Sequence, residues 1–241
     1  MSFLYRLKWF FVLTFVMTGF AAQAQNVKTY IHPKATELIP VIRLEAEKFA
    51  PQIETPWYFP GLIEHESCIS LRHSKCWHSA AELKNNREHG VGLGQLTASW
   101  DKYGKLRFDN LAEMKRRNPR DLGELSWDTI KSRPDLQIRT MIFMVNDSYK
   151  QLAPLKHPLE RLKMADSAYN GGISHVFKAR SMCGISRGCD PQLWDDNVER
   201  YLPKSKTPDS RYGGQSMYSI NIKHVRDVFY NRMDKFKPFF D

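Results

Sequence analysis

The sequence lacks an apolar run long enough to span a membrane, and it is short of acidic residues. Its longest apolar run, Trp9 to Ala22, has about 14 residues, whereas a spanning helix needs about 20. Only 26 acidic residues stand against 36 basic ones in 241, which leaves a net charge of +10. The hydrophobic share of 42% is that of an ordinary globular protein. These figures exclude a polytopic membrane protein and a disordered chain.

The first 24 residues have the three parts of a secretory signal peptide. Arg6 and Lys8 precede the apolar run, and Ala22-Gln23-Ala24 supplies small residues for cleavage. We expect cleavage before Gln25 and export to the periplasm. A basic exported protein suits an anionic partner. Neither zinc-finger nor basic-zipper spacing is present, so we expect no nucleic-acid partner.

Cysteine is scarce, and all four cysteines lie in the part predicted to be exported. They occur as two close pairs along the sequence, Cys68 with Cys76 and Cys183 with Cys189. An even count outside the cytosol predicts disulfides, although four cysteines allow three connectivities. Local bridges would each stabilise the fold by about 2–3 kcal/mol. We favour disulfides, and predict no metal or other cofactor, because the spacing fits no tight metal-ligand pattern. The alternative is a zinc site formed by Cys68, His73, Cys76 and His78.

Hydrophobic periodicity is helical almost throughout the rest of the chain. Apolar residues at three- and four-residue spacing predict helices at Pro33 to Phe49 and at Asp135 to Leu152. Asp190-Pro191 has the form of an N-cap followed by proline, which predicts a helix to about Tyr201. Another helix is expected from Tyr218 to Phe236, after an exposed, mobile loop from Pro203 to Ser216.

The sequence has no internal repeat, no low-complexity block and no convincing strand alternation. We therefore expect residues 25–241 to form one mainly α domain. At most a short β-hairpin is expected, in the irregular span from Cys68 to Gly94.

An apolar helix with ionisable residues at its end is predicted over Trp57 to Ser67. Partial desolvation there would raise the pKa of a carboxylic acid and keep it protonated, ready to act as a general acid. Glu64 and Glu66 are the candidates. Positions two apart point about 200° away from each other, so one should face a cleft and the other solvent. Glu66 falls on the apolar side, three residues after Ile63, and we expect His65 to turn away from it.

Two further segments could approach a ligand closely. Gly90-Val91-Gly92-Leu93-Gly94 places three glycines before Gln95, so that backbone and one amide side chain can reach a ligand. Ala168-Tyr169-Asn170-Gly171-Gly172 ends a helix with glycines suited to a left-handed C-cap, which leaves Tyr169 and Asn170 near the exit. Taken alone, each segment is more typical of a turn or a helix end.

Together and in this order, the segments resemble the motifs of the lysozyme-like lytic transglycosylases of the soluble lytic transglycosylase (SLT) type. In that family a catalytic glutamate and serine are followed by a glycine, leucine, variable, glutamine motif, then by alanine, tyrosine, asparagine, variable, glycine. Here they read Glu66-Ser67, Gly92-Leu93-Gly94-Gln95 and Ala168-Tyr169-Asn170-Gly171-Gly172. The resemblance implies a goose-type lysozyme fold, with a family core at about residues 49–170 and a helical extension at 190–241.

The resemblance also implies a reaction on peptidoglycan glycan strands. The bond between MurNAc and GlcNAc would be cleaved without water, leaving a 1,6-anhydro-MurNAc end. Glu66 would protonate the glycosidic oxygen and then accept the proton of the 6-hydroxyl, so one carboxylate would suffice where most glycoside hydrolases need two. Ser67 would orient the substrate or the glutamate, and Gln95 would contact the sugar. Tyr169 would hydrogen-bond near the glutamate, and Asn170 would hold the loop that presents Tyr169.

The chain departs from the family pattern at Gly94, where the family often has methionine, so an apolar wall of the cleft would be lost. The intervals between the motifs are longer than usual, and we interpret residues 68–91 and 101–133 as insertions. The second insertion contains a basic cluster, Lys115-Arg116-Arg117. The aromatic residues that could stack on sugar faces are Trp57, Trp77, Trp100 and Tyr103.

Two other functions stay open. A lysozyme-like hydrolase would recruit Glu64, Glu82 or Glu88 to activate water. A wall-binding accessory of a secretion, conjugation or phage apparatus would hold glycan in the same cleft with only incidental turnover. We expect a monomer, and both cleavage from strand ends and cleavage within strands are compatible with the sequence.

Overall fold

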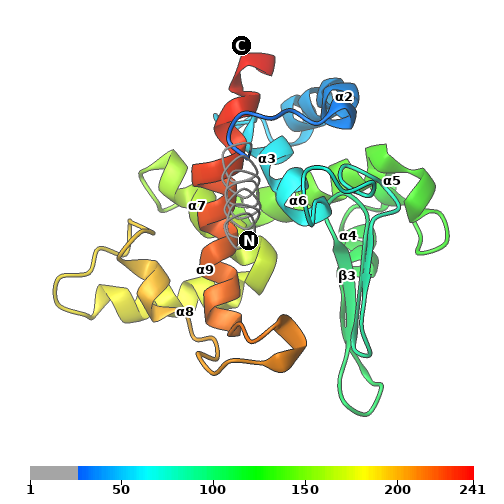
Figure 1. Cartoon of the computed structure of the whole chain (residues 1–241). Helices are drawn as coiled ribbons and strands as arrows, with labels where there is room; N and C mark the ends of the chain where they lie inside the picture. The colour runs from blue at the N-terminus through cyan, green and yellow to red at the C-terminus, as the bar shows by residue number, and fades with distance from the viewer. Residues whose placement is uncertain (1–26) are drawn as a thin grey trace, which may run out of the picture.

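The computed structural model describes residues 27–241, and its fold is mainly helical with one small antiparallel sheet (Figure 1). The predicted signal peptide and its cleavage point before Gln25 lie outside the described residues. Within residues 27–241, no helix has both the length and the apolar character that crossing a membrane requires.

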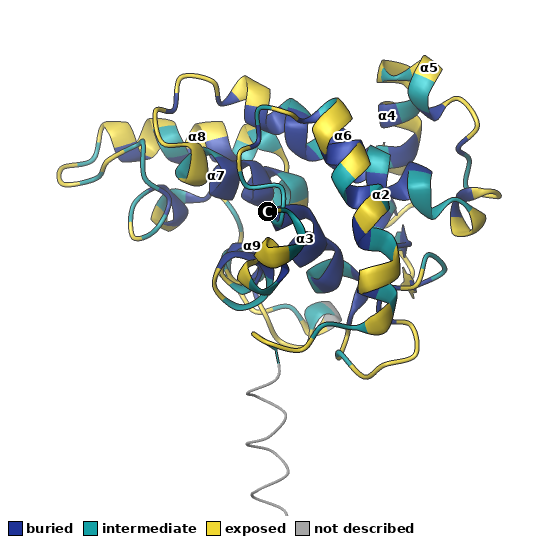
Figure 2. Ribbon diagram, turned by 90° about the horizontal axis from the view of Figure 1, so that it is seen from above, coloured by how far each residue is buried: buried dark blue, intermediate teal, exposed yellow. Residues whose placement is uncertain are grey.

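The longest helices form where the apolar spacing predicts them. Helix α2 spans Pro33–Phe49 and α6 spans Pro134–Gln151, each with proline in the first turn, where its missing N–H breaks no helical hydrogen bond. Helix α2 packs against both α6 and α3, Tyr58–Ser67. Eight of the ten residues of α3 are buried, and Figure 2 shows it in the interior. The predicted acid-bearing helix is therefore part of the main core.

The C-terminal helices complete that core around α3. They are α7 Pro158–Gly171, α8 Ile173–Gly184 and α9 Met217–Asp227. The helix predicted from Tyr218 to Phe236 does not stay α-helical: a π-helix, η4 Val228–Arg232, follows α9, and a 3₁₀ segment, η5 Met233–Phe239, follows that.

Both C-terminal segments pack on α3, and Gly61 makes this close approach possible. A Cβ at Gly61 would lie 2.9 Å from Cα of Met233. A π turn adds a residue to the helix, which shifts the side chains after it around the axis. In this register Arg232 and Lys235 both reach the carboxylate of Glu64 on α3.

The β-structure is larger than the short hairpin expected before Gly94. Four antiparallel strands follow one another in sequence order: β1 Glu82–Lys84, β2 Glu88–Val91, β3 Leu96–Trp100 and β4 Leu106–Asp109. The register pairs Gly90 with Thr97, and it shifts between Ser99 and Trp100. All of β1 and most of β4 are exposed, so their sequences lack the alternation that would have predicted strands.

The predicted insertion at residues 101–133 folds into β4 and a group of short helices. These are α4 Asn110–Arg117, α5 Pro119–Leu122 and the 3₁₀ turn η1 Ile130–Ser132. Their apolar residues form a second, smaller core with residues of β2, β3 and α6. The sheet and this second core lie beside the helical body (Figure 1). We call the helical body and this sheet region the two walls of the molecule.

The helix predicted from Asp190 to Tyr201 is wrong. Only its last four residues are helical, as the 3₁₀ turn η2 Val198–Tyr201. Trp194 is fully buried, and a carboxylate oxygen of Glu160 accepts its backbone N–H at 2.6 Å. Asp196 then adopts a left-handed φ of 55°, which a right-handed helix cannot accommodate. Burial of the tryptophan thus outweighs the local N-cap signal.

Of the three possible connectivities, the two local disulfides are formed. Cys68 bonds to Cys76, and Cys183 bonds to Cys189. The first disulfide joins the end of α3 to the following loop, and the second closes the turn after α8. Because both sulfur atoms are used in the first bond, the alternative zinc site loses two of its ligands. Two disulfides indicate an oxidising compartment, as expected for an exported protein.

Candidate active site

Three helices bring two acids to one imidazole ring. Glu66 lies in the last turn of α3, and its side chain is 16% exposed. Its Oε1 lies 3.7 Å from Nε2 of His224 on α9. The same nitrogen lies 3.6 Å from Oδ1 of Asp166 on α7. Asp166 and His224 are both buried, so Glu66 is the member of this group that solvent and substrate can reach.

The group around Glu66 contains polar atoms that no neighbour satisfies. Tyr58 donates its hydroxyl to Oδ1 of Asp166 at 2.5 Å, whereas Oδ2 of Asp166 has no hydrogen-bond partner in the described part of the chain. Among the same residues, neither ring nitrogen of His224 has a hydrogen-bond partner. Within residues 27–241, no lysine or arginine forms an ion pair with Glu66 or Asp166. Such unsatisfied groups are costly to bury and are concentrated at functional sites.

Burial controls the protonation of this group. Burial, followed by repulsion from Asp166, raises the pKa of Glu66 to about 8. Burial also raises the pKa of Asp166 to about 7, against the effect of the hydrogen bond from Tyr58. Burial and the neighbouring His65 hold the pKa of His224 well below its usual 6.5. At neutral pH, therefore, Glu66 carries a proton and His224 is uncharged.

Tyr169 lies next to this group and joins the two walls. It follows Asp166 by three residues, hence on the same face of α7, and its ring packs edge-on to His224 with centroids 6.5 Å apart. Its hydroxyl donates to the carbonyl oxygen of Gly94. A Cβ at Gly94 would lie only 2.7 Å from Oη of Tyr169. Glycine at this departure from the family pattern thus gives the tyrosine hydroxyl access to the backbone.

Ser67 and Gln95 contact their own surroundings. Ser67 is buried, donates its hydroxyl to the Ile63 carbonyl at 2.7 Å and accepts the N–H of Trp77 at 3.2 Å. Gln95 has a left-handed φ of 45°, and its Nε2 donates to the Gly92 carbonyl at 3.0 Å. Its Oε1 is buried and has no partner. Ser67 therefore fixes the end of α3, and Gln95 braces the glycine turn.

Asn170 and the glycines after it hold the end of α7. Gly172 caps α7 with a positive φ of 89°, as expected for a glycine there, but its ψ of 136° is not that of the left-handed helical cap that the sequence predicts. Buried Asn221 on α9 donates its amide to Oδ1 of Asn170 at 2.9 Å and to the Ser167 carbonyl at 3.0 Å. The hydroxyl of Ser167 donates to Oδ1 of Asn221 at 2.6 Å. The helix end that carries Tyr169 is thus fastened to α9.

Glu64 faces neither cleft nor solvent, so the expectation that the second acid of the pair faces solvent is wrong. Its carboxylate is fully buried, because η4 and η5 cover this side of α3. Oε1 lies 2.6 Å from Nζ of Lys235 and 3.2 Å from Nη1 of Arg232. Burial raises the pKa of Glu64, and the Lys235 ammonium group opposes that shift. Trp77 lies against the same carboxylate and is 1% exposed, which removes it from the sugar-stacking candidates.

His65 turns away from Glu66 and contacts it only through His224. Its Nδ1 lies 2.7 Å from Oδ2 of Asp227, and its ring stacks on that of His224 with centroids 4.4 Å apart. Asp227 also accepts Nε–H of Arg232 at 2.5 Å. Burial acts to raise the pKa of Asp227, but His65 and Arg232 hold it well below its usual value.

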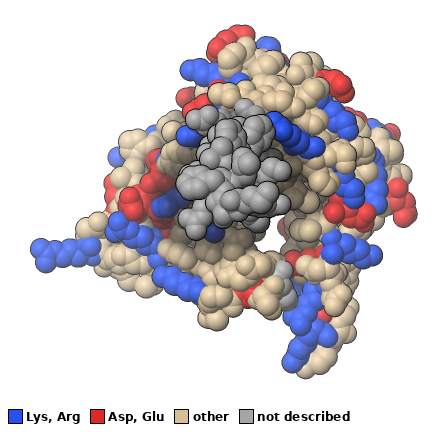
Figure 3. Space-filling model, in the orientation of Figure 1, with Lys and Arg blue, Asp and Glu red and all other residues tan. Residues whose placement is uncertain are grey.

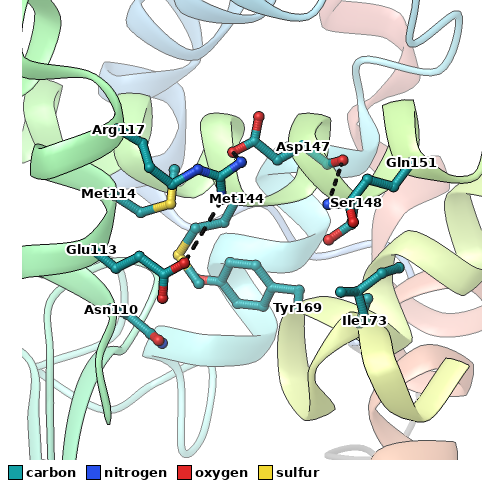
Figure 4. A pocket seen from close by; sticks show the side chains of 11 residues that line it. Asn110, Glu113, Met114, Arg117, Met144, Asp147, Ser148, Gln151, Tyr169 and Ile173 are labelled. Carbon is teal, nitrogen blue, oxygen red and sulfur yellow. Dashed lines mark hydrogen bonds and ion pairs between the residues drawn. The ribbon is translucent and has the colours of Figure 1, made fainter. Parts of the chain in front are cut away.

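A pocket of about 120 Å³ opens beside Tyr169 (Figure 4). Residues of α4, α6, α7 and α8 line it. Arg117, from the basic cluster of the second insertion, pairs with Asp147 at 2.8 Å there. The lysine of that cluster is used structurally, because Lys115 donates to the Leu125 carbonyl. The insertion therefore supplies one wall of a hollow that continues from the candidate site.

Sequence reasoning missed Asp166 and His224. Asp166 had a usable signal, since it is an acid one turn before Tyr169 in the third motif. His224 had no local signal, because its place beside Glu66 depends on how α9 packs against α3 and α7.

Comparison with known proteins adds no relative. No protein-family model matches this chain, and no curated protein is significantly similar to it.

Proposed function

We propose that this chain is an exported peptidoglycan lytic transglycosylase with a lysozyme-like fold and with Glu66 as its acid and base. The observation that carries the proposal is the state of Glu66: a partly exposed carboxylic acid with a pKa raised to about 8 and no lysine or arginine paired with it in residues 27–241. Such a group holds its proton at neutral pH and can give it to a leaving group.

The reaction needs one proton donor that becomes a proton acceptor. Glu66 transfers its proton to the glycosidic oxygen as the bond from that oxygen to C1 of MurNAc breaks. The resulting carboxylate takes the proton of the C6 hydroxyl while O6 bonds to C1. The products are a 1,6-anhydro ring and a free GlcNAc hydroxyl, Glu66 is protonated again, and no water is consumed.

The buried neighbours prepare Glu66 for both steps. Asp166 is fully buried and accepts a hydrogen bond from Tyr58, so it acts by raising the pKa of Glu66 and does not contact the glycan. Burial together with Asp166 keeps Glu66 protonated before the first step. His224 is uncharged, and neither of its ring nitrogens has a hydrogen-bond partner within the described residues, so with its proton on Nε2 it can donate to the Glu66 carboxylate formed between the two steps.

The positions of the other acids favour this reaction over hydrolysis. Hydrolysis with inversion needs a second carboxylate about 6.5–9.5 Å away, with room for a water molecule. Glu64 is buried with two cations. Glu82, on β1, pairs with His89 of β2 and with Lys131 of η1. Glu88 accepts a hydrogen bond from the hydroxyl of Tyr212. Each of the three acids suggested for water activation is thus engaged elsewhere.

The deciding experiment is mass spectrometry of products released from isolated peptidoglycan by the purified mature protein. Anhydro-muropeptides, lighter by one water molecule than hydrolytic products, are expected. They should disappear in Glu66→Gln and persist in Glu54→Gln, a matched change of an exposed acid. Products with reducing ends would establish a hydrolase. Binding to peptidoglycan without any product would establish a wall-binding accessory and overturn the proposal.

A further inference from the structure

The loop of residues 203–216, which we call the strap, crosses from the helical body to the sheet. Its tip is the 3₁₀ turn η3 Ser210–Tyr212. The hydroxyl of Tyr212 donates to Oε1 of Glu88 on β2 at 3.2 Å. Figure 1 shows the strap, in orange, extending toward the sheet below α9. The loop that the sequence predicts to be simply exposed therefore contacts the opposite wall.

Both ends of the strap are fixed beside the candidate active site. Lys204, at its start, donates Nζ to the carbonyl of Gly171 at the end of α7 at 3.2 Å. Ser216, at its end, forms the N-cap of α9, and its hydroxyl accepts the N–H of Ser219. The start of the strap is thus hydrogen-bonded to the helix that carries Tyr169, and its end continues into the helix that carries His224.

The tip of the strap has its own internal hydrogen bonds. Asp209 and Gln215 form an antiparallel bridge, with the N–H of Asp209 donated to the Gln215 carbonyl at 3.1 Å. Gly213 and Gly214 have φ values of 62° and 78°, which side chains rarely adopt, and they allow the chain to reverse. The position of Tyr212 is therefore set by an ordered turn.

Two bridges consequently join the same two walls. Strand β2, which carries Glu88, leads directly into the glycine turn whose Gly94 carbonyl accepts the Tyr169 hydroxyl. Tyr169 connects the two walls next to Glu66, and Tyr212 connects them at the tip of the strap; we call the space between the walls the groove. In Figure 3 an opening passes between the helical body and the sheet. The strap closes this opening on its outer side.

We propose that the strap turns the groove into a ring, so that a glycan strand enters by threading one of its ends. A closed ring excludes the middle of a long strand, whereas an open groove accepts it anywhere. The chain would then cut from strand ends and release small anhydro products in succession. This inference rests on the proposed function, because it concerns the same groove and the same glycan.

The test compares cleavage of long, peptide-free glycan strands by strap variants. Tyr212→Phe removes the hydroxyl that reaches Glu88. In a second variant, two glycines replace residues 210–214, and the bridge between Asp209 and Gln215 keeps the base of the strap in place. Tyr230→Phe is the matched control, since it also removes a tyrosine–carboxylate hydrogen bond. Its partner is Asp195, in the turns between α8 and η2. The length distribution of the remaining strands is followed with time.

The wild-type protein and Tyr230→Phe should release anhydro-disaccharides while the remaining strands shorten slowly. Tyr212→Phe should raise the ratio of internal to terminal cuts about fivefold, the effect expected from one hydrogen bond. The shortened strap should cut internally from the start. Internal cutting by the wild type, or terminal cutting by all variants, would overturn the inference and leave the proposed function intact. Absence of cleavage by every protein would overturn both.

Discussion

Glu64 and Glu66 lie two residues apart on α3, yet their surroundings are opposite. Glu64 is buried against two cations, Lys235 and Arg232. Glu66 is partly exposed and has another acid and an uncharged imidazole as its polar neighbours. The difference arises from the sides of the helix that they occupy: one faces the π and 3₁₀ segments, and the other faces α7 and α9. The same residue type is thus a structural anion in one place and a proton donor in the other.

The largest effect is expected from Glu66→Gln. The amide has nearly the same shape but neither donates nor accepts the reacting proton, so the rate of anhydro-product release should fall by about 10²–10⁴-fold. Initial rates on isolated peptidoglycan measure this loss, with thermal unfolding as a check of the fold. Activity within tenfold of the wild type would show that another group is the acid. Glu66 would then not differ from Glu64 in function.

Glu64→Gln should act on stability instead. It leaves the buried Lys235 without its counter-charge and leaves Arg232 paired with Asp227 alone, which is expected to lower the free energy of unfolding by about 3–5 kcal/mol. Urea denaturation measures the change. Glu47→Gln is the control, because its exposed contact with Arg43 contributes less than about 1 kcal/mol. If both variants are equally stable, the ion cluster around Glu64 does not stabilise the fold.

The pH dependence should sharpen the comparison further. Activity needs protonated Glu66, so it should decline as the pH rises through about 8. The folded-state pKa of Glu66 lies above its ordinary value of 4.5, so folding binds protons and the stability contribution is lost as pH rises toward 8. Glu66→Gln should remove this loss, which between pH 6.5 and 8 amounts to about 2 kcal/mol of wild-type stability.

Thermal unfolding between pH 6.5 and 8 is the appropriate measurement for that comparison. Below pH 6.5 the lowered pKa of His224 acts in the opposite direction, because stability then rises with pH. Equal slopes for wild type and Glu66→Gln across this window would contradict the raised pKa of Glu66.

The smallest effect is expected at Gly94. In Gly94→Ala the new Cβ would lie 2.7 Å from Oη of Tyr169 and 3.3 Å from Cβ of Met141, which should cost about 1–3 kcal/mol and reduce activity by displacing the tyrosine. Gly184→Ala, at the end of α8, is the control, since its Cβ meets only Pro191 at 3.8 Å. Normal activity of Gly94→Ala would show that the position of Tyr169 does not matter.

Features encoded within one helix could be predicted from the sequence. The periodicity at Pro33 to Phe49 gives α2 with the same bounds, and the apolar run before Ser67 gives α3. The close spacing of each cysteine pair favours the local disulfides that are formed. In each case the deciding interactions lie within a few residues, so the local pattern contains them.

Features that depend on packing between distant segments could not be predicted. The exposed strands β1 and β4 are held by pairing with neighbours and not by an alternating pattern. Trp194 is buried by its tertiary surroundings, which replaces the expected helix with turns. The candidate site shows the same division: Glu66 and Tyr169 belong to recognisable motifs, whereas His224 reaches them only through the placement of α9.

The ion cluster at the covered side of α3 bears on how the pKa of Glu66 responds to salt. Two anions, Glu64 and Asp227, are matched there by Arg232 and Lys235, so the cluster adds no net charge behind Glu66. The shift at Glu66 comes from burial and from one buried neighbour, and interactions of that kind are screened little by dissolved ions. Under the proposed function, this basic chain would therefore bind peptidoglycan more weakly as salt rises, while the pH at which its activity declines would stay the same.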